Sequence, residues 1–361
     1  MKNTFGSSIT VTLFGESHGE EIGAVIDGIA PGIEIDREYI EKCLAARRPQ
    51  GKISTARVEG DSFRIVSGEF GGFTTGTPLT ILIKNENTRS SDYERTKNLP
   101  RPSHADYTAE CKYHGFQDYR GGGHFSGRIT APLVAAGAIL RAALKKKGIT
   151  VGSHILNLHG IADRKIKTAD DVSILEERLF PVLDAAVEEP MRAEILAAKE
   201  AGDSVGGILE GGIFGIPAGV GEPFFDSVES VISHMVFSIP AIKGVEFGLG
   251  FGFCDTLGSE ANDEFISEGG RIQTKTNNNG GINGGITNGM PIIFRCAVKP
   301  TPSIYKEQTT VNLATGESTT IKIEGRHDPA IIHRVRAVLD AAVAIAVADI
   351  LTVRYGTDFL R

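Results

Sequence analysis

The sequence of 361 residues lacks tryptophan and contains only four cysteines, which lie far apart along the chain. No two of them have the CxxC spacing that zinc sites and thiol redox centres use, and four are too few for a disulfide framework in a chain of this length. We therefore expect a reducing compartment, no metal site, and cysteines that act as small apolar residues.

Long hydrophobic runs are also missing. The longest candidate, residues 341–348, lies between Asp340 and Asp349 and is much shorter than the roughly 20 residues of a membrane-spanning helix. The first residues, MKNTFGSS, lack the apolar core of roughly 7 to 15 residues that a secretory signal has. These absences predict a soluble, cytoplasmic protein with no membrane partner.

Positive charge is not in excess, because the formal net charge is −7. This argues against nucleic acid as a partner, since binding to a phosphate backbone needs a basic field. Basic residues nevertheless gather locally in residues 42–57 and 120–128. An acidic protein with local basic loops is typical of one that binds a small anionic ligand.

Glycine is abundant, with 44 residues, and separates short strand-like runs such as 79–83, 208–216 and 292–298. This pattern favours antiparallel sheets over a regular alternation of parallel strands and helices. No stretch has the composition of a linker between domains. We therefore expect residues 1–361 to form a single domain.

Three helices are predicted from their end signals. Asp36 can cap a helix that ends near Arg47, residues 130–147 have a lysine-rich last turn, and residues 329–351 follow Asp328 as a candidate N-cap. The last two helices are apolar around most of their circumference, which indicates burial on several sides. Each follows a segment rich in Gly, Arg and His. The predicted fold is α+β, an internally duplicated sandwich with a buried helical core between antiparallel β-sheets.

The segment FGESHG, residues 14–19, lies between two apolar runs that alternate as strands do. Glycines on both sides allow a tight turn and the close approach of a ligand, with His18 at the tip. An imidazole suits proton transfer near neutral pH. A turn histidine bonded to the local backbone is the structural alternative.

The segment RPSHADY, residues 101–107, places a carboxylate two residues after a histidine. If the segment is extended, His104 and Asp106 point to the same side, and the carboxylate can orient or charge the imidazole. His104 is therefore a second candidate for acid–base chemistry. A satisfied structural histidine is the alternative.

Glycine-rich segments offer possible ligand contacts. Residues 121–123 precede a helix N-terminus, whose N–H groups suit a phosphate, although the spacing fits no Walker or dinucleotide motif and a flexible turn is the alternative. Residues 277–289 are rich in amides and could surround a flat heteroaromatic ring, with Lys299, Thr301 and Ser303 beyond them for a phosphate. A mobile surface loop is the alternative there.

The segment GRHDP, residues 325–329, opens the last predicted helix. Asp at the N-cap followed by Pro at the first helical position is a common start of a helix, which is the structural explanation of this segment. However, Arg326, His327 and Arg334 bring charge to the end of an apolar helix, and buried charge is costly unless it is paired. This also makes the segment a candidate for function.

Together these segments follow one order along the chain that is far more specific than any single motif. The order is FGESHG at 14–19, RRP at 47–49, TTGTP at 74–78, RPSHADY at 101–107, DYRGGG at 118–123, SIPAIKGVEFG at 238–248, GGINGG at 280–285, KPTPS at 299–303 and GRHDP at 325–329. The chain resembles the chorismate synthase family over nearly its whole length. It is similar to the monofunctional, bacterial type, because no extension for a flavin reductase is evident.

The resemblance implies a lyase of the shikimate pathway, which leads to aromatic amino acids. The implied reaction converts 5-enolpyruvylshikimate 3-phosphate to chorismate and phosphate by anti-1,4-elimination, with reduced FMN and no net redox change. The resemblance also implies a homotetramer and a separate flavin reductase, with NADPH only as an indirect source of electrons.

The same resemblance assigns roles to residues. His18 would protonate or poise the reduced flavin, His104 would protonate the departing phosphate, and Asp328 would assist proton transfer at flavin N5. Flavin contacts are expected at His124, Phe125, Ser126, Pro240, Ala241, Gly284, Lys299, Pro300, Thr301, Pro302, Ser303 and Arg326. Contacts to the anionic groups of the substrate or to an NADP phosphate are expected at Arg47, Arg48, Lys52, Arg128 and Arg334.

The chain departs from the family at two places. The family text after the three glycines is Arg-Ser-Ser-Ala-Arg, whereas residues 124–128 read His-Phe-Ser-Gly-Arg. Where relatives have a second arginine after the RRP step, Lys52 or Arg57 must serve here. A non-catalytic protein that binds flavin or a phospho-ligand is therefore a rival reading, although His18 and His104 are retained. A nucleotide-dependent phosphotransferase is a weaker rival, because no phosphate loop with Lys and a metal-binding carboxylate is found.

Overall fold

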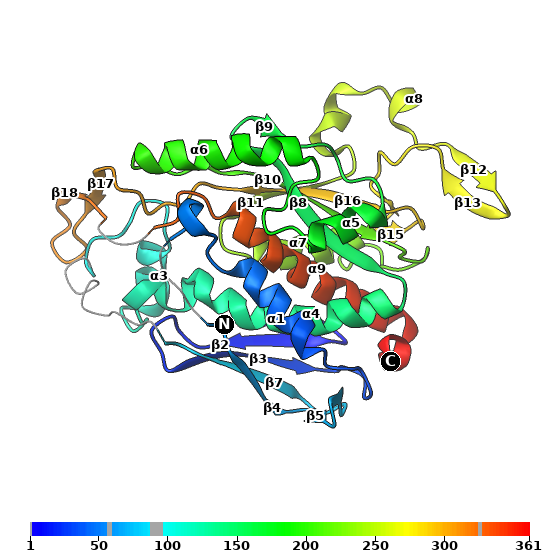
Figure 1. Cartoon of the computed structure of the whole chain (residues 1–361), viewed down its shortest axis with the longest axis horizontal. Helices are drawn as coiled ribbons and strands as arrows, with labels where there is room; N and C mark the ends of the chain where they lie inside the picture. The colour runs from blue at the N-terminus through cyan, green and yellow to red at the C-terminus, as the bar shows by residue number, and fades with distance from the viewer. Residues whose placement is uncertain (1, 56–59, 87–96, 324–326) are drawn as a thin grey trace.

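In the computed structural model, two five-stranded antiparallel sheets enclose a layer of helices (Figure 1). The structure describes residues 2–55, 60–86, 97–323 and 327–361. The predicted sandwich with a buried helical core is confirmed. Within the described residues, the hydrophobic core is continuous from the first sheet through the helices to the second sheet.

The two sheets come from the two halves of the chain. The first has the order β1 (Thr4–Phe5), β2 (Thr10–Phe14), β3 (Glu21–Asp27), β7 (Leu79–Lys84) and β4 (Phe63–Ser67). The second has the order β11 (Ile242–Phe247), β16 (Ile292–Val298), β10 (Gly207–Phe214), β8 (Thr150–Leu158) and β9 (Ile161–Ala162). The runs predicted at 79–83, 208–216 and 292–298 match β7, β10 and β16 to within two residues, and the apolar runs on either side of FGESHG match β2 and β3. The strands β4, β8 and β11 were not predicted.

Four helices fill the space between the sheets. They are α1 (Arg37–Arg47), α4 (Thr130–Lys146), α7 (Val228–Phe237) and α9 (Ile332–Tyr355), and α4 packs along α9. A Cβ added at Gly137 of α4 would lie within 2.6 Å of the backbone of Ala341, so glycine allows the two helices to approach closely. The segment 127–146 is long and apolar enough to cross a membrane, but 89% of its most apolar window is buried inside the fold.

Internal duplication is visible in the order of elements. The first half runs β2, β3, α1, β4, β7 and α4, and the second runs β8, β10, α7, β11, β16 and α9. The neighbours within each sheet correspond, because β2-β3-β7-β4 matches β8-β10-β16-β11. The second half adds α5 (Ala169–Glu176) and α6 (Glu188–Glu200) before β10. The two halves thus bury equivalent helices against each other.

Smaller elements decorate this frame. They are α3 (Asp106–Tyr113), α8 (Gly258–Ala261), the hairpins β5–β6 (Glu69–Phe70, Phe73–Thr74), β12–β13 (Phe265–Glu268, Arg271–Thr274), β14–β15 (Ile282–Asn283, Ile286–Thr287) and β17–β18 (Gln308–Val311, Ser318–Ile321), and the 3-10 turns η1 (Gly51–Ile53), η2 (Arg120–Phe125), η3 (Gly127–Ile129), η4 (Ala185–Val187), η5 (Gly250–Asp255) and η6 (Thr357–Leu360). The β12–β13 hairpin projects from the body of the molecule (Figure 1).

Two helix starts were predicted correctly and one was wrong. Asp36 caps α1 by accepting a hydrogen bond from the backbone of Tyr39, and α4 begins at residue 130 as expected. The last helix, however, begins at Ile332, and Asp328 does not cap it. The carboxylate of Asp328 is engaged elsewhere, since it accepts from the backbone N–H of Thr55 at 2.8 Å and pairs with Arg334.

Candidate active site

A cavity of about 880 Å³ opens where the C-terminal end of α1 meets the first turns of α4 and α9. Its wall continues along the end of α7 into β11 and along residues 299–303 after β16. This convergence follows from the duplicated topology, because equivalent helices begin at the same end of the sandwich. Most of the predicted site residues lie here.

The predicted residues that line this cavity come from both halves of the chain. They are His104, Asp328, His124, Phe125, Ser126, Pro240, Ala241, Lys299, Thr301, Pro302, Ser303, Arg47, Arg48, Arg128 and Arg334. Ala241 adopts φ +77°, which is uncommon for a residue with a side chain and is typical of functional sites.

Four predicted residues lie elsewhere in the fold. Gly284 is in the turn of the β14–β15 hairpin and Lys52 is exposed in η1. Pro300 lies beside Gly206, where an added Cβ would be 2.9 Å from Cδ of the proline. His18 lies next to the cavity wall but is not part of its surface. Two further residues, Arg326 and Arg57, lie outside the described residues.

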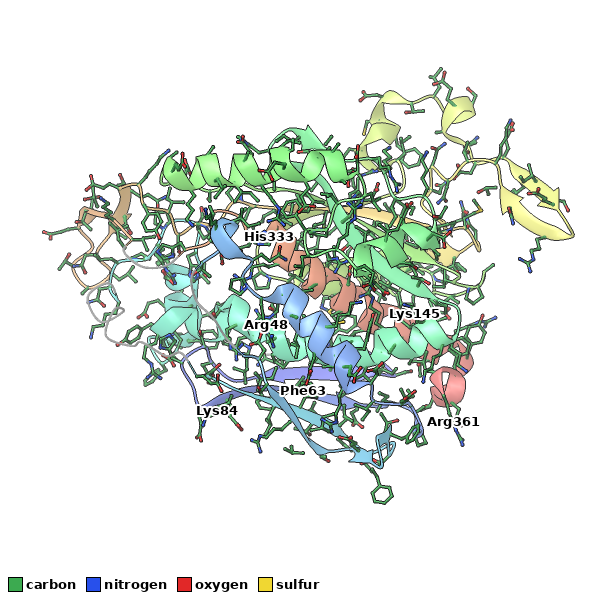
Figure 2. All side chains as sticks on the ribbon, viewed as in Figure 1. Arg48, Phe63, Lys84, Lys145, His333 and Arg361 are labelled. Atoms are coloured by element: carbon green, nitrogen blue, oxygen red, sulfur yellow. The ribbon has the colours of Figure 1, made fainter. Side chains whose placement is uncertain are left out.

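One buried carboxylate joins three of the cavity arginines. The side chain of Asp61 has no exposed surface, and its Oδ2 lies 3.3 Å from Arg47 Nη2 and 3.8 Å from Arg48 Nε. Its Oδ1 pairs with Arg128. Figure 2 shows Arg48 at the end of α1, toward the middle of the molecule. Guanidinium groups stay protonated in proteins, so this end of the cavity is permanently cationic.

A second ion pair continues this cluster toward α9. Arg334 pairs with Asp328, and its Nε donates to the carbonyl oxygen of Arg47 at 2.8 Å. Arg128 is held from the side of the first sheet, because its Nε donates to Asn85 Oδ1 at 2.9 Å. These contacts give the cationic end of the cavity a fixed geometry.

His104 is held by the carboxylate that the sequence pattern suggested. Its Nδ1 lies 2.7 Å from Asp106 Oδ1, and Arg101 donates to both oxygens of that carboxylate at 2.7 and 2.8 Å. Burial alone would raise the pKa of the Asp106 carboxyl, but the hydrogen bonds from Arg101 and His104 outweigh it and hold the pKa well below its usual range. Asp106 is therefore an anion that keeps a proton on Nδ1 of His104.

The expected extended geometry of this segment is wrong, although the contact is right. Ser103 has φ +60°, and helix α3 begins at Asp106. A turn, rather than a strand, therefore brings His104 and Asp106 together. Nε2 of His104 lies near Gly122, where an added Cβ would be 3.7 Å away.

His18 packs against Gly121, the residue before Gly122. A Cβ added at Gly121 would lie 2.6 Å from Nε2 of His18, so only glycine leaves room for this imidazole. Ser17 donates its backbone N–H to the carbonyl oxygen of Gly123 at 3.1 Å, which fastens the two loops together. The two candidate imidazoles, His18 and His104, thus contact consecutive glycines of one turn.

His124 belongs to the same loop pair. Its Nδ1 donates to the carbonyl oxygen of Gly15 at 2.8 Å, so Nε2 is left for the cavity that the residue lines. At this position the chain thus places an imidazole that is bound through one nitrogen to the FGESHG loop. The predicted phosphate role of the glycine triplet itself stays a prediction.

Two lysines form a second cationic region of the cavity. Lys243 of β11 and Lys299 both line it, and Lys299 Nζ donates to the carbonyl oxygen of Ser103 at 2.6 Å. Burial, assisted by repulsion from Lys243, lowers the pKa of Lys299. A partly buried lysine beside another cation is suited to an anionic group such as a phosphate.

Sequence reasoning missed several residues of the cavity. Lys243 lies within the quoted motif SIPAIKGVEFG, so its position was a usable signal. Phe5 and His234 also line the cavity, with ring centroids 5.4 Å apart, and no local pattern marks either of them. Asp61 follows a basic stretch as the second of two acids, after Glu59, and only the fold shows which arginines Asp61 joins.

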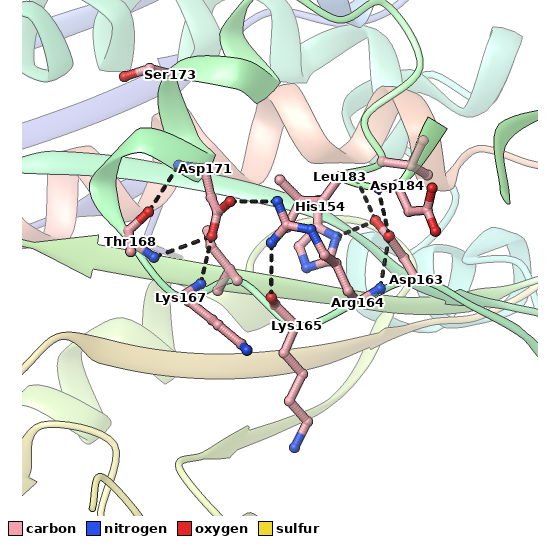
Figure 3. Close-up of polar contacts among 12 residues, drawn as sticks. His154, Asp163, Arg164, Lys165, Lys167, Thr168, Asp171, Ser173, Leu183 and Asp184 are labelled. Carbon is pink, nitrogen blue, oxygen red and sulfur yellow. Dashed lines mark hydrogen bonds and ion pairs between the residues drawn. The ribbon is translucent and has the colours of Figure 1, made fainter. Parts of the chain in front are cut away.

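A second buried polar cluster lies outside the cavity, on the second sheet (Figure 3). His154 has no exposed surface, and its Nδ1 and Nε2 lie 3.0 Å from Asp163 and 3.1 Å from Glu210. Burial lowers the pKa of His154, but the hydrogen bonds to the two carboxylates outweigh it and raise the pKa. Asp163 also accepts from the backbone of Leu183 and Asp184 (Figure 3). This cluster fastens loops to the sheet.

His333, in the first turn of α9, is another histidine with a structural place (Figure 2). Its Nε2 lies 2.8 Å from the hydroxyl of Ser54, and its ring stacks on Phe180 with centroids 6.2 Å apart. Burial lowers its pKa to about 3, so the imidazole is neutral at physiological pH. Among the described residues, no group of three or more His, Cys, Asp or Glu side chains is placed to hold a metal ion.

The cavity can therefore bind a multiply anionic ligand and supply a proton to it. Its arginines and lysines are cationic, and His104 is oriented by a fixed anion with Nε2 available. Its volume is in the range of sites that hold drug-sized ligands and cofactors.

Comparison with known proteins gives one consistent result. The family model for chorismate synthase matches residues 9–352. The chain is 46% identical over 349 residues to chorismate synthase from Pyrococcus abyssi, covering 97% of both chains. It is 48% identical over 349 residues to that from Chitinophaga pinensis, covering 97% of this chain and 96% of the relative. A crystal structure of chorismate synthase matches with a TM-score of 0.76 and 27% identity, covering 98% of this chain and 94% of that one.

Proposed function

The chain belongs to the chorismate synthase family, and from this premise we propose that it converts 5-enolpyruvylshikimate 3-phosphate to chorismate and inorganic phosphate. The reaction is an anti-1,4-elimination in which the C3 phosphate and a hydrogen at C6 are lost. The coarser statement, that the protein is an enzyme of the chorismate-forming step toward aromatic amino acids, follows from family membership alone.

One observation carries the proposal. The arginine cluster around Asp61 and the oriented imidazole of His104 open into the same cavity. The proposed substrate carries two carboxylates and a phosphate of about −1.5 to −2 charges, so it needs several fixed cations. Arg47, Arg48, Arg128 and Arg334 supply them in an otherwise acidic protein.

His104 is proposed as the acid that protonates the departing phosphate. The Asp106 carboxylate accepts from Nδ1, so Nε2 is the nitrogen that delivers a proton to a leaving group in the cavity. Arg101 keeps the carboxylate in place and leaves the imidazole little freedom to rotate. A positioned acid of this kind commonly contributes about 10²- to 10⁴-fold to a rate.

Reduced FMN is proposed as the cofactor, and the residues of the cavity fit it. The predicted flavin contacts from three separate segments, 124–126, 240–241 and 299–303, lie around one space, except Pro300. Thr301 Oγ1 is buried and has no hydrogen-bond partner within the described part of the chain, as expected of a group kept for a ligand. Lys299 and Lys243 suit its phosphate. Bound there, reduced FMN would supply electron density for the loss of phosphate and would take up the hydrogen lost from C6.

His18 is proposed to protonate or poise the reduced flavin, and Asp328 is proposed to assist proton transfer at flavin N5. His18 packs against Gly121, which lines the cavity, so the imidazole stands directly behind that wall. Asp328 lines the cavity itself and is oriented by Thr55 and Arg334. These contacts hold the Asp328 carboxylate in a fixed position at the cavity, and the residue does not cap α9.

The remaining expectations are part of the same proposal. They are a homotetramer, a cytoplasmic location, a separate reductase that supplies the reduced flavin, and NADPH acting only through that reductase. No binding of nucleic acid is proposed, because the formal charge is −7.

An anaerobic assay tests the proposal. The protein is mixed with chemically reduced FMN and 5-enolpyruvylshikimate 3-phosphate, and chorismate absorbance and released phosphate are followed together. We expect both products in equal amounts. Flavin binding without chorismate would favour the rival reading of a non-catalytic binding protein.

A further inference from the structure

We infer that Asp61 is a positioning residue that fixes three cavity arginines in the orientation that binds the anionic groups of the substrate. The inference rests on the proposed function and deepens it, because it assigns the geometry of the binding site to one residue. Nothing in the sequence motifs singles out Asp61.

The carboxylate of Asp61 joins two segments that are far apart in the sequence. Its Oδ2 faces Arg47 and Arg48 at the end of α1, and its Oδ1 faces Arg128 in the turn before α4. The carboxylate is therefore a bridge across the base of the cavity. The carboxylate has no exposed surface, so its ion pairs with the buried Arg47 and Arg128 are sheltered from solvent and salt, while the Arg48 side chain is 36% exposed.

The backbone at this position is adapted to the bridge. Asp61 has φ +50°, in the left-handed region that few residues other than Gly, Asn and Asp adopt readily. Asp61 lies just before β4, and β4 is anchored in the first sheet by its pairing with β7. The carboxylate is thus held by the sheet and projects into the arginine cluster.

Each arginine has a further contact that completes its orientation. Arg47 Nη1 donates to the carbonyl oxygen of Gly127 at 3.3 Å, and Arg48 donates to that of Gly60. Arg128 Nη2 donates to the carbonyl oxygen of Lys84 at 3.0 Å. Asp61 is the one group within the described residues that contacts all three guanidinium groups by ion pairs.

Three permanent cations this close together repel one another, and buried charge is costly without a partner. A shared carboxylate allows the cluster to be assembled before the substrate arrives. Preorganised cations stabilise bound and developing charge more effectively than mobile ones. Asp61 therefore increases affinity for an anion although its own charge is negative.

This reasoning predicts a sign opposite to that of simple charge balance. If Asp61 only tempered the positive charge, removing its charge would make the cavity more cationic and tighten anion binding. If it positions the arginines, removing the charge releases them and weakens binding. The two accounts are therefore separated by the direction of one change in affinity.

The test is calorimetric titration of the full-length protein with 5-enolpyruvylshikimate 3-phosphate, using wild type, Asp61→Asn and Glu69→Gln. Asn is tolerated at left-handed φ, so the backbone is preserved in the first variant. Glu69 pairs with Arg37 at the surface, away from the cavity, and is the matched control for loss of a carboxylate beside an arginine. We expect the Kd to rise about 10-fold or more for Asp61→Asn and to stay unchanged for Glu69→Gln. In turnover, Asp61→Asn should raise KM by more than it lowers kcat.

Equal or tighter binding by Asp61→Asn would overturn the inference. Should that variant not fold, Asp61→Gly adopts the same backbone and carries the same comparison. Failure of both variants to fold would show that Asp61 acts on the fold rather than on the site, and would also overturn it. If wild type itself binds no 5-enolpyruvylshikimate 3-phosphate, the proposed function fails instead, and the two failures are therefore distinguishable.

Discussion

Nδ1 of His104 lies 2.7 Å from Oδ1 of Asp106, two residues further along the chain. Arg101 donates to the same carboxylate from Nε, from Nη2 and from its backbone N–H, so the imidazole, the carboxylate and the guanidinium form one fixed group. This arrangement leaves a single nitrogen, Nε2, to act on a ligand. The chemistry proposed for the cavity depends on that assignment.

Replacing His104 with Ala is expected to lower kcat by about 10²- to 10⁴-fold, because the proposed acid for the departing phosphate is removed. KM should change little, since the arginines proposed to bind the substrate are untouched. Asp106→Asn should reproduce part of the loss, because a neutral amide holds the proton on Nδ1 less strongly than the carboxylate does. Steady-state kinetics with reduced FMN measures both effects. Wild-type turnover by His104→Ala would remove His104 from the mechanism.

His18→Ala is expected to lower turnover by roughly 10- to 10⁴-fold. The upper part of this range is the usual one for acid–base groups, which is about 10²- to 10⁴-fold. The reason is its place behind Gly121, next to the proposed flavin site. His159→Ala is the matched control, because that histidine is exposed and pairs only with Glu194 among the described residues. If both variants turn over like wild type, His18 has a structural role in fastening its loop.

Lys299 should make flavin binding sensitive to alkaline pH. Burial and Lys243 lower its pKa, so its charge is lost at lower pH than that of an ordinary lysine, whose pKa is about 10.4. FMN affinity should therefore fall as pH rises, beginning below that value. Lys243→Met removes the repulsion and should move the fall to higher pH. Fluorescence titration with FMN measures both profiles, and the titration of flavin itself affects both proteins equally. Identical profiles would contradict a phosphate role for this pair.

The His154 cluster predicts how stability depends on pH. The pKa of His154 is raised in the fold, so its stabilisation is complete below the unfolded value of about 6.5 and is lost as pH rises through the folded value. The pKa of Asp163 is lowered by His154 and backbone donors against the effect of burial, so its contribution is present above about 3.9 and lost as pH falls through the folded value. The cluster stabilises most between these limits.

His154→Gln should therefore destabilise the protein by about 3–5 kcal/mol near pH 5.5 to 6, since it leaves buried carboxylates without their partner. The difference from wild type should shrink toward alkaline pH. His159→Gln, which loses an exposed ion pair, should cost no more than about 1 kcal/mol. Urea unfolding at several pH values measures these differences. A pH-independent difference for His154→Gln would show that the imidazole is not charged in the fold.

Local sequence signals predicted those parts of the fold that local interactions determine. Asp36 and the Arg-Pro step after Arg47 marked α1 correctly, because capping and the restriction before proline act within a few residues. Asp328 and Pro329 have the same local grammar, yet α9 begins later. The ion pair with Arg334, six residues further along, and the hydrogen bond from the backbone of Thr55, which is distant in the sequence, decide that case. No local pattern distinguishes the two.

The site could be predicted only in part for the same reason. The nearness of His104 to Asp106 followed from their spacing, although a turn rather than a strand produces it. Flavin and the residue roles came from resemblance to a family. Asp61 was not predicted, because its partners are determined by how β4, α1 and the turn before α4 pack.

The central claim is that one cavity holds a flavin beside a multiply anionic substrate, with His104 at the leaving phosphate. A crystal structure of the protein with oxidised FMN and 5-enolpyruvylshikimate 3-phosphate tests it most directly. We expect both ligands in the cavity between α1, α4 and α9, with the substrate phosphate about 3 Å from Nε2 of His104 and within reach of the arginines around Asp61. A flavin bound elsewhere, or a phosphate remote from His104, would contradict the account.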